Sequence, residues 1–272
     1  MTGTSSALDD AERTAILAVA VEAAVRAGAV LMEHFGALQA DEVTTKSSAR
    51  DLVTAADVAS ERLLVETLRA AYPGHAIEAE EEVRDAPDES RPRWFLDPLD
   101  GTVNYVHRLP CFAVSMGLWS AGVPEVAVIH APKLGETFTA VRGGGAKLNG
   151  RTIHVSDAQS LAESILATGF PYRRGELEHS NLENFGRFFY DVRGVRRMGS
   201  AAMDLAWVAD GRLDGYWELH LSPHDVAAGA LLVREAGGVV TDADGGEDWL
   251  RGGHIVAAGP GIHAAIRARI VH

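Results

Sequence analysis

Two aspartates stand three residues apart in the run Trp-Phe-Leu-Asp-Pro-Leu-Asp-Gly-Thr at 94–102. Residues 94–96 predict a short buried strand that ends at Asp97, because Pro98 supplies no N–H and prevents a regular continuation. Like charges repel at close range, so the pair of Asp97 and Asp100 needs compensation, for which a divalent cation is the simplest candidate. Carboxylate oxygens and a backbone carbonyl suit Mg²⁺, which keeps waters that a substrate can displace.

Gly101 and Thr102 follow at a position where a helix can start. Free backbone N–H groups and a hydroxyl at a helix start bind anions. Acids, a cation and an anion site together indicate chemistry on a phosphate. A surface turn with two solvated aspartates is the alternative for the bare spacing.

The composition limits the function classes. The chain has 272 residues, of which 47% are hydrophobic and 23% charged, and its formal net charge is −13. This length can bury a large core in one domain or in two closely joined halves. The negative charge argues against direct nucleic-acid binding and against an anionic membrane surface. Bound cations would still allow a phosphate ester as substrate.

Cysteine usage and the N-terminus favour a cytoplasmic protein. The single cysteine, Cys111, excludes an internal disulfide and is interpreted as a small apolar residue rather than a nucleophile. The N-terminus lacks the basic region of a signal peptide. The apolar stretch 15–32 is broken by Glu22 and Arg26, which favours a helix with a buried face over a membrane span.

The first elements follow from capping patterns. Residues 1–8 are expected to form a disordered tail, and Asp9 with Glu12 predicts a capped helix that runs to about residue 35. Residues 37–50 are interpreted as a loop. Asp57 is predicted in the first turn of a second helix, where the helix dipole favours a carboxylate. Capping alone is the alternative role for Asp57.

Helices and strands then interleave. Strands are predicted at 111–118, 125–130, 136–141, 165–168, 212–218, 239–241 and 254–257, and helices within 172–194 and at 201–209, 226–236 and 261–271. The glycines at 143–145 predict a hairpin turn, because no lysine follows as in a P-loop. The interleaving predicts a layered sandwich of helices and sheets. Periodicity alone does not distinguish this from a doubly wound sheet.

Four motifs carry a family resemblance. The run W-F-L-D-P-L-D-G-T-V-N-Y at 94–105 resembles, position by position, the signature W-x-[IL]-D-P-[IL]-D-G-T-x-N-[FY] of the inositol monophosphatase family. Matching motifs lie in the family's order at 51–61, 72–81 and 196–225. The chain is most like the bacterial inositol-1-monophosphatases. The resemblance implies an α/β (α+β) fold, a layered α-β-α-β-α sandwich of the sugar-phosphatase type, in a single catalytic domain over 9–272 with two subdomains split near residue 150.

Two positions depart from the family pattern. Ala79 replaces the usual glycine, and it would strain the loop if a positive φ were needed there. The acidic pair after it aligns as Glu80–Glu81, with a shift to Glu81–Glu82 as the alternative. His224 replaces the usual tryptophan before the last aspartate. Packing beside the site is the favoured interpretation for His224, and a side chain that points inward is the alternative.

The resemblance implies two or three Mg²⁺ ions per site. Glu80, Asp97 and the backbone carbonyl of Leu99 resemble the ligands of one ion. Asp97, Asp100 and Asp225 resemble the ligands of a second. The implied reaction is the in-line attack of a metal-activated water on the phosphate. Glu80 would orient that water.

The resemblance also implies the catalytic and substrate-binding residues. Thr102 and Asp57 resemble a hydroxyl–carboxylate pair that activates the water, together with Glu80. Glu218 resembles the family's hydroxyl acceptor. The full set of substrate-binding residues is Asp100, Gly101, Thr102, Gly199, Ser200, Ala201, Glu218 and Asp225. Structural roles are favoured for Asp204 and Asp214.

The leading hypothesis is a Mg²⁺-dependent phosphomonoesterase that hydrolyses inositol 1-phosphate or a related polyol phosphate. The family suggests inhibition by Li⁺ and a homodimer. Alternatives within the superfamily are a histidinol-phosphate phosphatase, a fructose-1,6-bisphosphatase and a 3′-phosphoadenosine-type nucleotidase. An alternative of another class is a regulatory module that binds protein or RNA and retains the phosphatase fold. The complete set of carboxylates favours an enzyme.

Overall fold

The computed structural model describes residues 8–38, 42–46 and 52–272. The helices are α1 (Asp10–His34), α2 (Ala55–Ala71), α3 (Thr102–Val106), α4 (Leu182–Phe188), α5 (Ala201–Ala209), α6 (Pro223–Glu235) and α7 (His263–Arg267), with a 3₁₀ turn η2 (Leu161–Glu163). The strands are β1 (Val43–Thr45), β2 (Leu52–Thr54), β3 (Ala76–Ala79), β4 (Arg93–Asp100), β5 (Ala113–Ser120), β6 (Val123–Ala131), β7 (Glu136–Val141), β8 (Gly145–Leu148), β9 (Arg151–Thr152), β10 (Ile165–Thr168), β11 (Gly194–Arg196), β12 (Gly215–Leu219), β13 (Val239–Thr241) and β14 (His254–Ala258).

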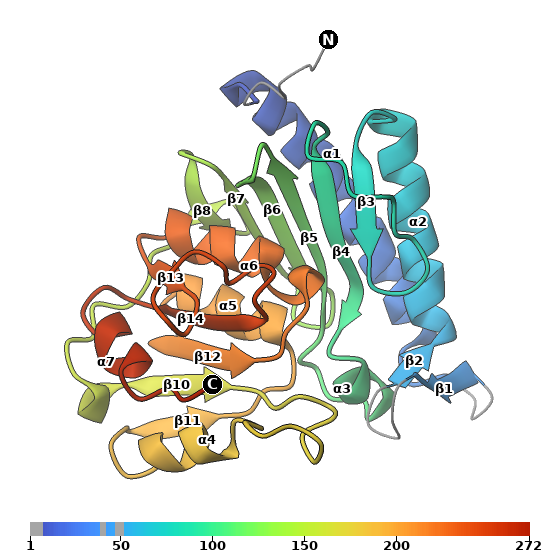
Figure 1. Ribbon diagram of the computed structural model, residues 1–272. Coiled ribbons are helices and arrows are strands. Elements are labelled where there is room, and N and C mark those ends of the chain that lie inside the picture. Colours follow the sequence, from blue (N-terminus) through green and yellow to red (C-terminus); the bar gives the residue numbers. More distant parts are fainter. Residues whose placement is uncertain (1–7, 39–41, 47–51) are drawn as a thin grey trace.

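The strands of the described residues form three sheets. A seven-stranded sheet has the order β3-β4-β5-β6-β7-β8-β9, a five-stranded sheet has the order β11-β10-β12-β14-β13, and β1 pairs with β2. Helices α1 and α2 cover one face of the seven-stranded sheet, and α5 and α6 lie between the two larger sheets (Figure 1). Helices α4 and α7 pack on the other face of the five-stranded sheet. This α-β-α-β-α order of layers confirms the predicted fold class.

Helices α1 and α2 both start with a capping box. Asp9 and Glu12 cap α1 reciprocally, as predicted, and Thr54 and Asp57 do the same at α2. The buried face of α1 is rich in alanine and packs against α2 and the seven-stranded sheet. By length and composition alone α1 would suffice to cross a membrane. Its packing is that of a core helix, in agreement with the predicted buried face.

Gly117 in β5 lets α6 pack directly on the seven-stranded sheet. A Cβ atom at this position would lie 2.9 Å from atoms of Ala227 and from the backbone nitrogen of Ala228 in α6. A larger residue would push the helix away, because a packed core has no space to take up the difference. Since β5 pairs with β4, this close approach brings the start of α6 near the end of β4.

Strand β4 does not end at Asp97, contrary to the prediction. It continues through Pro98 to Asp100, with a register shift between the two aspartates. Strand β3 pairs with β4 only as far as Leu96. Beyond that residue, strand β4 is flanked by β5 and no longer by β3. A bulge at such a place tolerates a missing N–H. Both aspartates are therefore held by a sheet.

Other differences concern the bounds of elements and the short strands β3 and β11, which were not predicted. Helix α7 is shorter than the predicted 261–271, and the expected loop at 37–50 includes β1. Residues 1–7 of the expected tail lie outside the described residues, whereas Leu8 packs against the core. The single domain with a division near residue 150 stays a prediction.

Candidate active site

Three aspartates converge where β4 ends and α6 begins. Asp97 and Asp100 lie on β4 and Asp225 lies on α6, and one carboxylate oxygen of each lies within 4.8 Å of the others. Only 2% of Asp97 and 9% of Asp100 is exposed. Two elements separated by more than 120 positions in the chain thus place three acids around one point.

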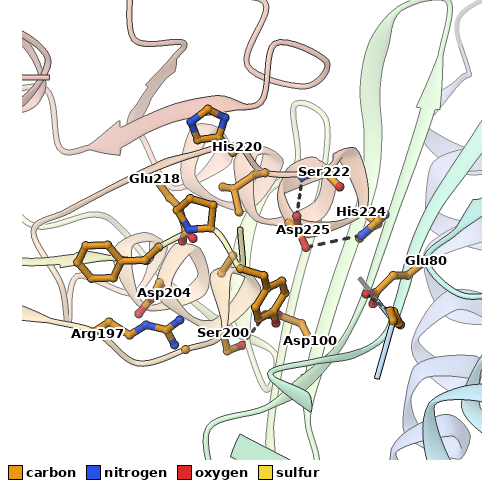
Figure 2. Close-up of a pocket in the computed structure, with 18 of the residues that line it drawn as sticks. Glu80, Asp100, Arg197, Ser200, Asp204, Glu218, His220, Ser222, His224 and Asp225 are labelled. Atoms are coloured by element: carbon orange, nitrogen blue, oxygen red, sulfur yellow. Dashed lines mark hydrogen bonds and ion pairs between the residues drawn. The ribbon is translucent and has the colours of Figure 1, made fainter. Parts of the chain in front are cut away.

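Helix α6 begins one turn earlier than predicted, so Asp225 lies in its first turn. Ser222 caps the helix, and Pro223 occupies the first helical position. Proline suits this position because a backbone N–H there would have no partner within the helix. The Asp225 side chain accepts a hydrogen bond from the backbone N–H of Ser222 at 2.6 Å. The Nε2 atom of His224 lies 3.8 Å from Asp225 Oδ1 (Figure 2). The favoured packing role for His224 is therefore wrong, because its imidazole points toward the acids.

Glu80 joins the acids directly after β3. Lys46 donates hydrogen bonds to Glu80 at 2.8 Å and to Glu81 at 2.6 Å. Burial would raise the pKa of Glu80, but the charges of His224 and Lys46 outweigh it and hold that pKa below its usual value. Glu82 is exposed. These contacts favour the first alignment of the acidic pair as Glu80 and Glu81, which stays a prediction.

Glu61 of α2 fixes the segment after β3. Its carboxylate accepts backbone hydrogen bonds from Glu81, Glu82 and Val83 at 2.7, 2.8 and 2.9 Å. A carboxylate that binds three successive N–H groups holds a loop firmly. Ala79 is the last residue of β3 and is not among the described residues with positive φ. The alanine therefore causes no strain, and Glu80 keeps its place.

Thr102 connects Asp57 to the end of β4. Its hydroxyl lies 3.2 Å from Asp57 Oδ1 and 3.0 Å from the carbonyl oxygen of Leu99, so it can donate its one proton to either. The other oxygen of Asp57 accepts hydrogen bonds from the hydroxyl and the N–H of Thr54 at 2.6 and 2.8 Å. Burial raises the pKa of Asp57 to about 6, against the effect of these bonds.

The predicted helix start at Gly101 and Thr102 is confirmed. Gly101 caps α3 with a φ of 92°, and a Cβ atom there would lie 2.9 Å from the carbonyl oxygen of Cys111. Only glycine meets both conditions. The first N–H groups of a helix have no partner within the helix and are available to an anion. Burial raises the pKa of the Cys111 thiol, in keeping with its predicted apolar role.

The start of α5 binds Asp100. The Ser200 hydroxyl donates a hydrogen bond to Asp100 Oδ2, and the N–H of Ala202 donates to the same oxygen at 2.7 Å. Ser200 also caps the helix, as predicted, by accepting a bond from the N–H of Met203. These contacts bring the segment that begins at Gly199 against the acids of β4.

Glu218 on β12 lies at the far end from Glu80 (Figure 2). Its Oε2 atom accepts a hydrogen bond from the Tyr216 hydroxyl at 2.6 Å. Gly169 leaves room for this carboxylate, since a Cβ atom there would lie 2.0 Å from Glu218 Oε2. Burial raises the pKa of Glu218 to about 7, while the bond from Tyr216 and the charge of Arg197 act in the opposite direction.

One cavity of about 290 Å³ joins these parts. Predicted site residues in its lining are Glu80, Asp100, Gly199, Ser200, Ala201, Glu218 and Asp225. The other predicted site residues, which adjoin this lining through the contacts above, are Asp57, Asp97, Leu99, Gly101 and Thr102. The structure thus brings the predicted set together, although the role of each residue stays a prediction.

Lys46, Arg197 and Asp204 also line the cavity and were not predicted there. Lys46 lies in a polar segment without periodicity, which gives no signal of a site. Asp204 lies in the first turn of α5, where the helix dipole alone would explain an acid. Asp214 does have the expected structural contact, since its Oδ2 accepts a hydrogen bond from the N–H of Ile165 at 2.6 Å.

The charge balance of the acids fits a divalent cation. Burial raises the pKa of Asp97 well above its usual value, and the charges of Glu80, Asp100 and Asp225 raise it further. Burial likewise raises the pKa of Asp100 to about 7. Hard oxygen donors that converge within 4.8 Å match the preference of Mg²⁺. Glu80, the three aspartates and the Leu99 carbonyl are the groups that would hold it.

This balance predicts how pH and metal act on stability. The pKa values of Asp100 (about 7) and Asp57 (about 6) lie above that of an unfolded aspartate, about 4. The folded protein therefore holds protons that the unfolded chain releases, and without metal its stability should fall as pH rises from about 4 to 7. Because Mg²⁺ binds the ionised carboxylates, it should raise the Tm more at pH 8 than at pH 5. Thermal unfolding with Mg²⁺ or chelator measures this, and equal shifts at both pH values would contradict it.

Comparisons with known proteins agree with the motifs. A model of the inositol monophosphatase family matches residues 12–272. The Nus factor SuhB of Salmonella typhimurium is 44% identical over 255 residues, which cover 94% of this chain and 95% of that protein. The inositol-1-monophosphatase of Mesorhizobium japonicum is 43% identical over 255 residues, which cover 93% and 95%. The structure of the inositol monophosphatase from Anabaena matches with a TM-score of 0.86 and 43% identity, over 94% of this chain and 95% of that one.

Proposed function

Since the chain belongs to the inositol monophosphatase family, we propose that it is a Mg²⁺-dependent phosphomonoesterase that hydrolyses inositol 1-phosphate or a related polyol phosphate. The observation that carries this proposal is a single cavity with converging carboxylates at one end and the hydroxyl acceptor Glu218 at the other. The first end suits a phosphate bound through cations, and the second suits a polyol. The name of the Mesorhizobium relative supports the same activity.

The residues at the phosphate end have separate tasks. Mg²⁺, when bound there, supplies a nucleophilic water and positive charge for the phosphate oxygens. Glu80 orients the attacking water by accepting a hydrogen bond from it. The Thr102 hydroxyl can pass its proton to the Asp57 carboxylate, to which it donates a hydrogen bond, as it takes a proton from that water. The N–H groups of Gly101 and Thr102 donate to the phosphate oxygens as charge develops.

The residues at the polyol end fix the leaving group. Glu218 accepts a hydroxyl of the polyol, and the bond from Tyr216 holds its carboxylate in one orientation. The segment from Gly199 to Ala201 lines the ring. Phosphate and polyol are thus bound at opposite ends, so the ester oxygen lies between them. A water protonates the leaving alkoxide.

The test is phosphate release by the purified protein, with Mg²⁺ and with chelator. We expect Mg²⁺-dependent turnover of inositol 1-phosphate that chelator abolishes. Histidinol phosphate, fructose 1,6-bisphosphate and 3′-phosphoadenosine 5′-phosphate, assayed in parallel, test the alternatives within the superfamily. A folded protein that hydrolyses none of these esters with Mg²⁺ would overturn the proposal.

A second candidate is a regulatory protein with the phosphatase fold. The name Nus factor SuhB, borne by the Salmonella relative, is the observation that favours it. The net charge of −13 favours a protein partner over direct contact with RNA. A folded protein without turnover would favour this candidate over the first.

The homodimer, the cytoplasmic location and the inhibition by Li⁺ stay predictions. Side chains on and after α4 support a second copy, because Leu182, Phe189 and Tyr190 are 67%, 58% and 90% exposed. Exposed apolar side chains that gather within a short segment are typical of a protein–protein contact.

A further inference from the structure

Asp204 is a buried carboxylate without a hydrogen-bond partner for Oδ1 among the described residues. Only 1% of this residue is exposed. An unpaired polar atom in such a place lowers stability, and a native protein rarely keeps one without a reason. The interpretation of Asp204 as a structural residue gives no such reason, because a structural acid is expected to hold a partner.

The N-terminus of α5 does not provide the missing partner. The N–H of Ala202 donates to Asp100, and the N–H of Met203 donates to the Ser200 hydroxyl. The backbone N–H of Asp204 itself donates to the carbonyl of Ser200. The first-turn N–H groups closest to the Asp204 carboxylate are therefore already bound to other acceptors.

Asp204 belongs to the polyol end of the cavity. It lines the cavity together with Glu218 and Arg197, and all three lie at the end away from Glu80 (Figure 2). Burial raises the pKa of Asp204 well above its usual value and that of Glu218 to about 7, and the positive charge of the exposed Arg197 opposes both shifts. Glu218 already has the Tyr216 hydroxyl as a partner, whereas Asp204 Oδ1 has none. At this end the cavity therefore offers the Asp204 carboxyl group beside that of Glu218, and among the described residues nothing pairs with Asp204 Oδ1.

We propose that Asp204 is a second polyol-binding residue, which accepts a hydrogen bond from a substrate hydroxyl beside the one that Glu218 binds. This inference rests on the proposed function. It narrows the substrate class to phosphate esters of polyols with at least two hydroxyls remote from the phosphate. An ester without these hydroxyls leaves the carboxylate unpaired and gains nothing from it.

The test combines two variants with two substrates. Asp204→Leu removes the acceptor, and Asp204→Asn keeps a neutral one. Inositol 1-phosphate carries the ring hydroxyls, and p-nitrophenyl phosphate has none. We expect Asp204→Leu to lower kcat/KM for inositol 1-phosphate by roughly 10- to 100-fold, as for a hydrogen bond to a charged group. The kcat/KM of Asp204→Leu for p-nitrophenyl phosphate should change less than about threefold. For inositol 1-phosphate, the kcat/KM of Asp204→Asn should lie between those of the wild type and Asp204→Leu.

Thermal stability distinguishes a ligand-binding role from a structural one, because replacement of a structural residue would lower the Tm. The Tm of ligand-free Asp204→Asn should equal or exceed that of the wild type, because the variant removes a buried acid whose Oδ1 has no partner among the described residues. Asp214→Asn is the matched control, since it weakens a real bond to the Ile165 N–H. It should lower the Tm and leave the ratio of kcat/KM for the two substrates unchanged.

The outcomes distinguish a failure of the proposed role of Asp204 from a failure of the proposed phosphatase activity. Equal losses for both substrates, or no loss for inositol 1-phosphate, would overturn the role of Asp204 and leave the proposed phosphatase intact. If the wild type hydrolyses neither ester, calorimetric binding of inositol 1-phosphate in the presence of Ca²⁺ decides instead. Weaker binding by Asp204→Leu than by the wild type would then support the polyol contact, although the proposed reaction fails. Equal binding by the two proteins, or no binding by the wild type, would overturn the role of Asp204.

Discussion

Replacement of Asp97 by asparagine is expected to reduce turnover of inositol 1-phosphate by at least about 1,000-fold. Asp97 is the acid that the family resemblance assigns to both ion sites. Its carboxylate lies within 4.8 Å of those of Asp100 and Asp225, and among its charged neighbours Glu80 raises its pKa most. Asparagine keeps the shape and one oxygen but loses the charge that holds the cations. The loss should therefore appear mainly in kcat, with phosphate release as the measurement.

The same substitution should leave the fold intact. Asp97 Oδ1 accepts a hydrogen bond from the N–H of Leu99 at 3.0 Å, and an asparagine oxygen can accept it too. Without metal, the variant should be at least as stable as the wild type at pH 8, because one of several repelling buried charges is gone. Mg²⁺ should no longer raise its Tm. Asp85→Asn is a matched control, since Asp85 accepts a backbone bond from Ile77 outside the cavity. Turnover by Asp97→Asn close to that of the wild type would contradict the proposed metal site.

The acids of β4 were predictable because their types and spacing are informative without a structure. Two aspartates around a proline after an apolar run indicate charge concentrated at the end of a strand. Asp225 was found only through the family motif. Its distance from Asp97 depends on Gly117, which lets α6 approach β5, and no local pattern predicts such long-range packing.

Strand β4 shows why a local rule failed. Pro98 was expected to end the strand, because a proline removes a ladder hydrogen bond. The rule applies to a regular strand between two neighbours, whereas β3 has already ended there and a register shift takes up the irregularity. The carbonyl of Pro98 instead accepts a hydrogen bond from the Ser60 hydroxyl at 2.9 Å. Which neighbours a strand keeps along its length is a tertiary property, and the sequence pattern did not contain it.

Supporting residues were the hardest to predict. Glu61 lies four residues after Asp57 on the same face of α2, and both are buried acids. That spacing was visible, but an acid on a helix face is usually solvated, and the partners of Glu61 are backbone N–H groups about 20 residues away in the chain. Lys46 offered even less signal. Such residues act through backbone groups and charges that only the folded chain brings near.

The pairing of Thr102 with Asp57 predicts the second large effect. Thr102→Val keeps the shape of the side chain and removes its hydroxyl, which lies 3.2 Å from Asp57 Oδ1. If this hydroxyl accepts a proton from the attacking water, kcat should fall by roughly 100-fold or more, as for other lost acid–base groups. Thr102→Ser keeps the hydroxyl and should retain most of the activity.

A double-mutant cycle separates a proton relay from mere packing. In a relay, Thr102 and Asp57 act as one unit, so Thr102→Val combined with Asp57→Asn should be no slower than the worse single variant. If each residue only supports the local structure, the two losses in kcat should multiply. Asp57 also binds Thr54 and therefore has a structural task at the start of α2, so Asp57→Asn should lower the Tm by more than Thr102→Ser does. Multiplying losses in kcat, together with additive losses in Tm, would assign both residues to the scaffold and leave the activation of the water to Glu80 and the bound cations.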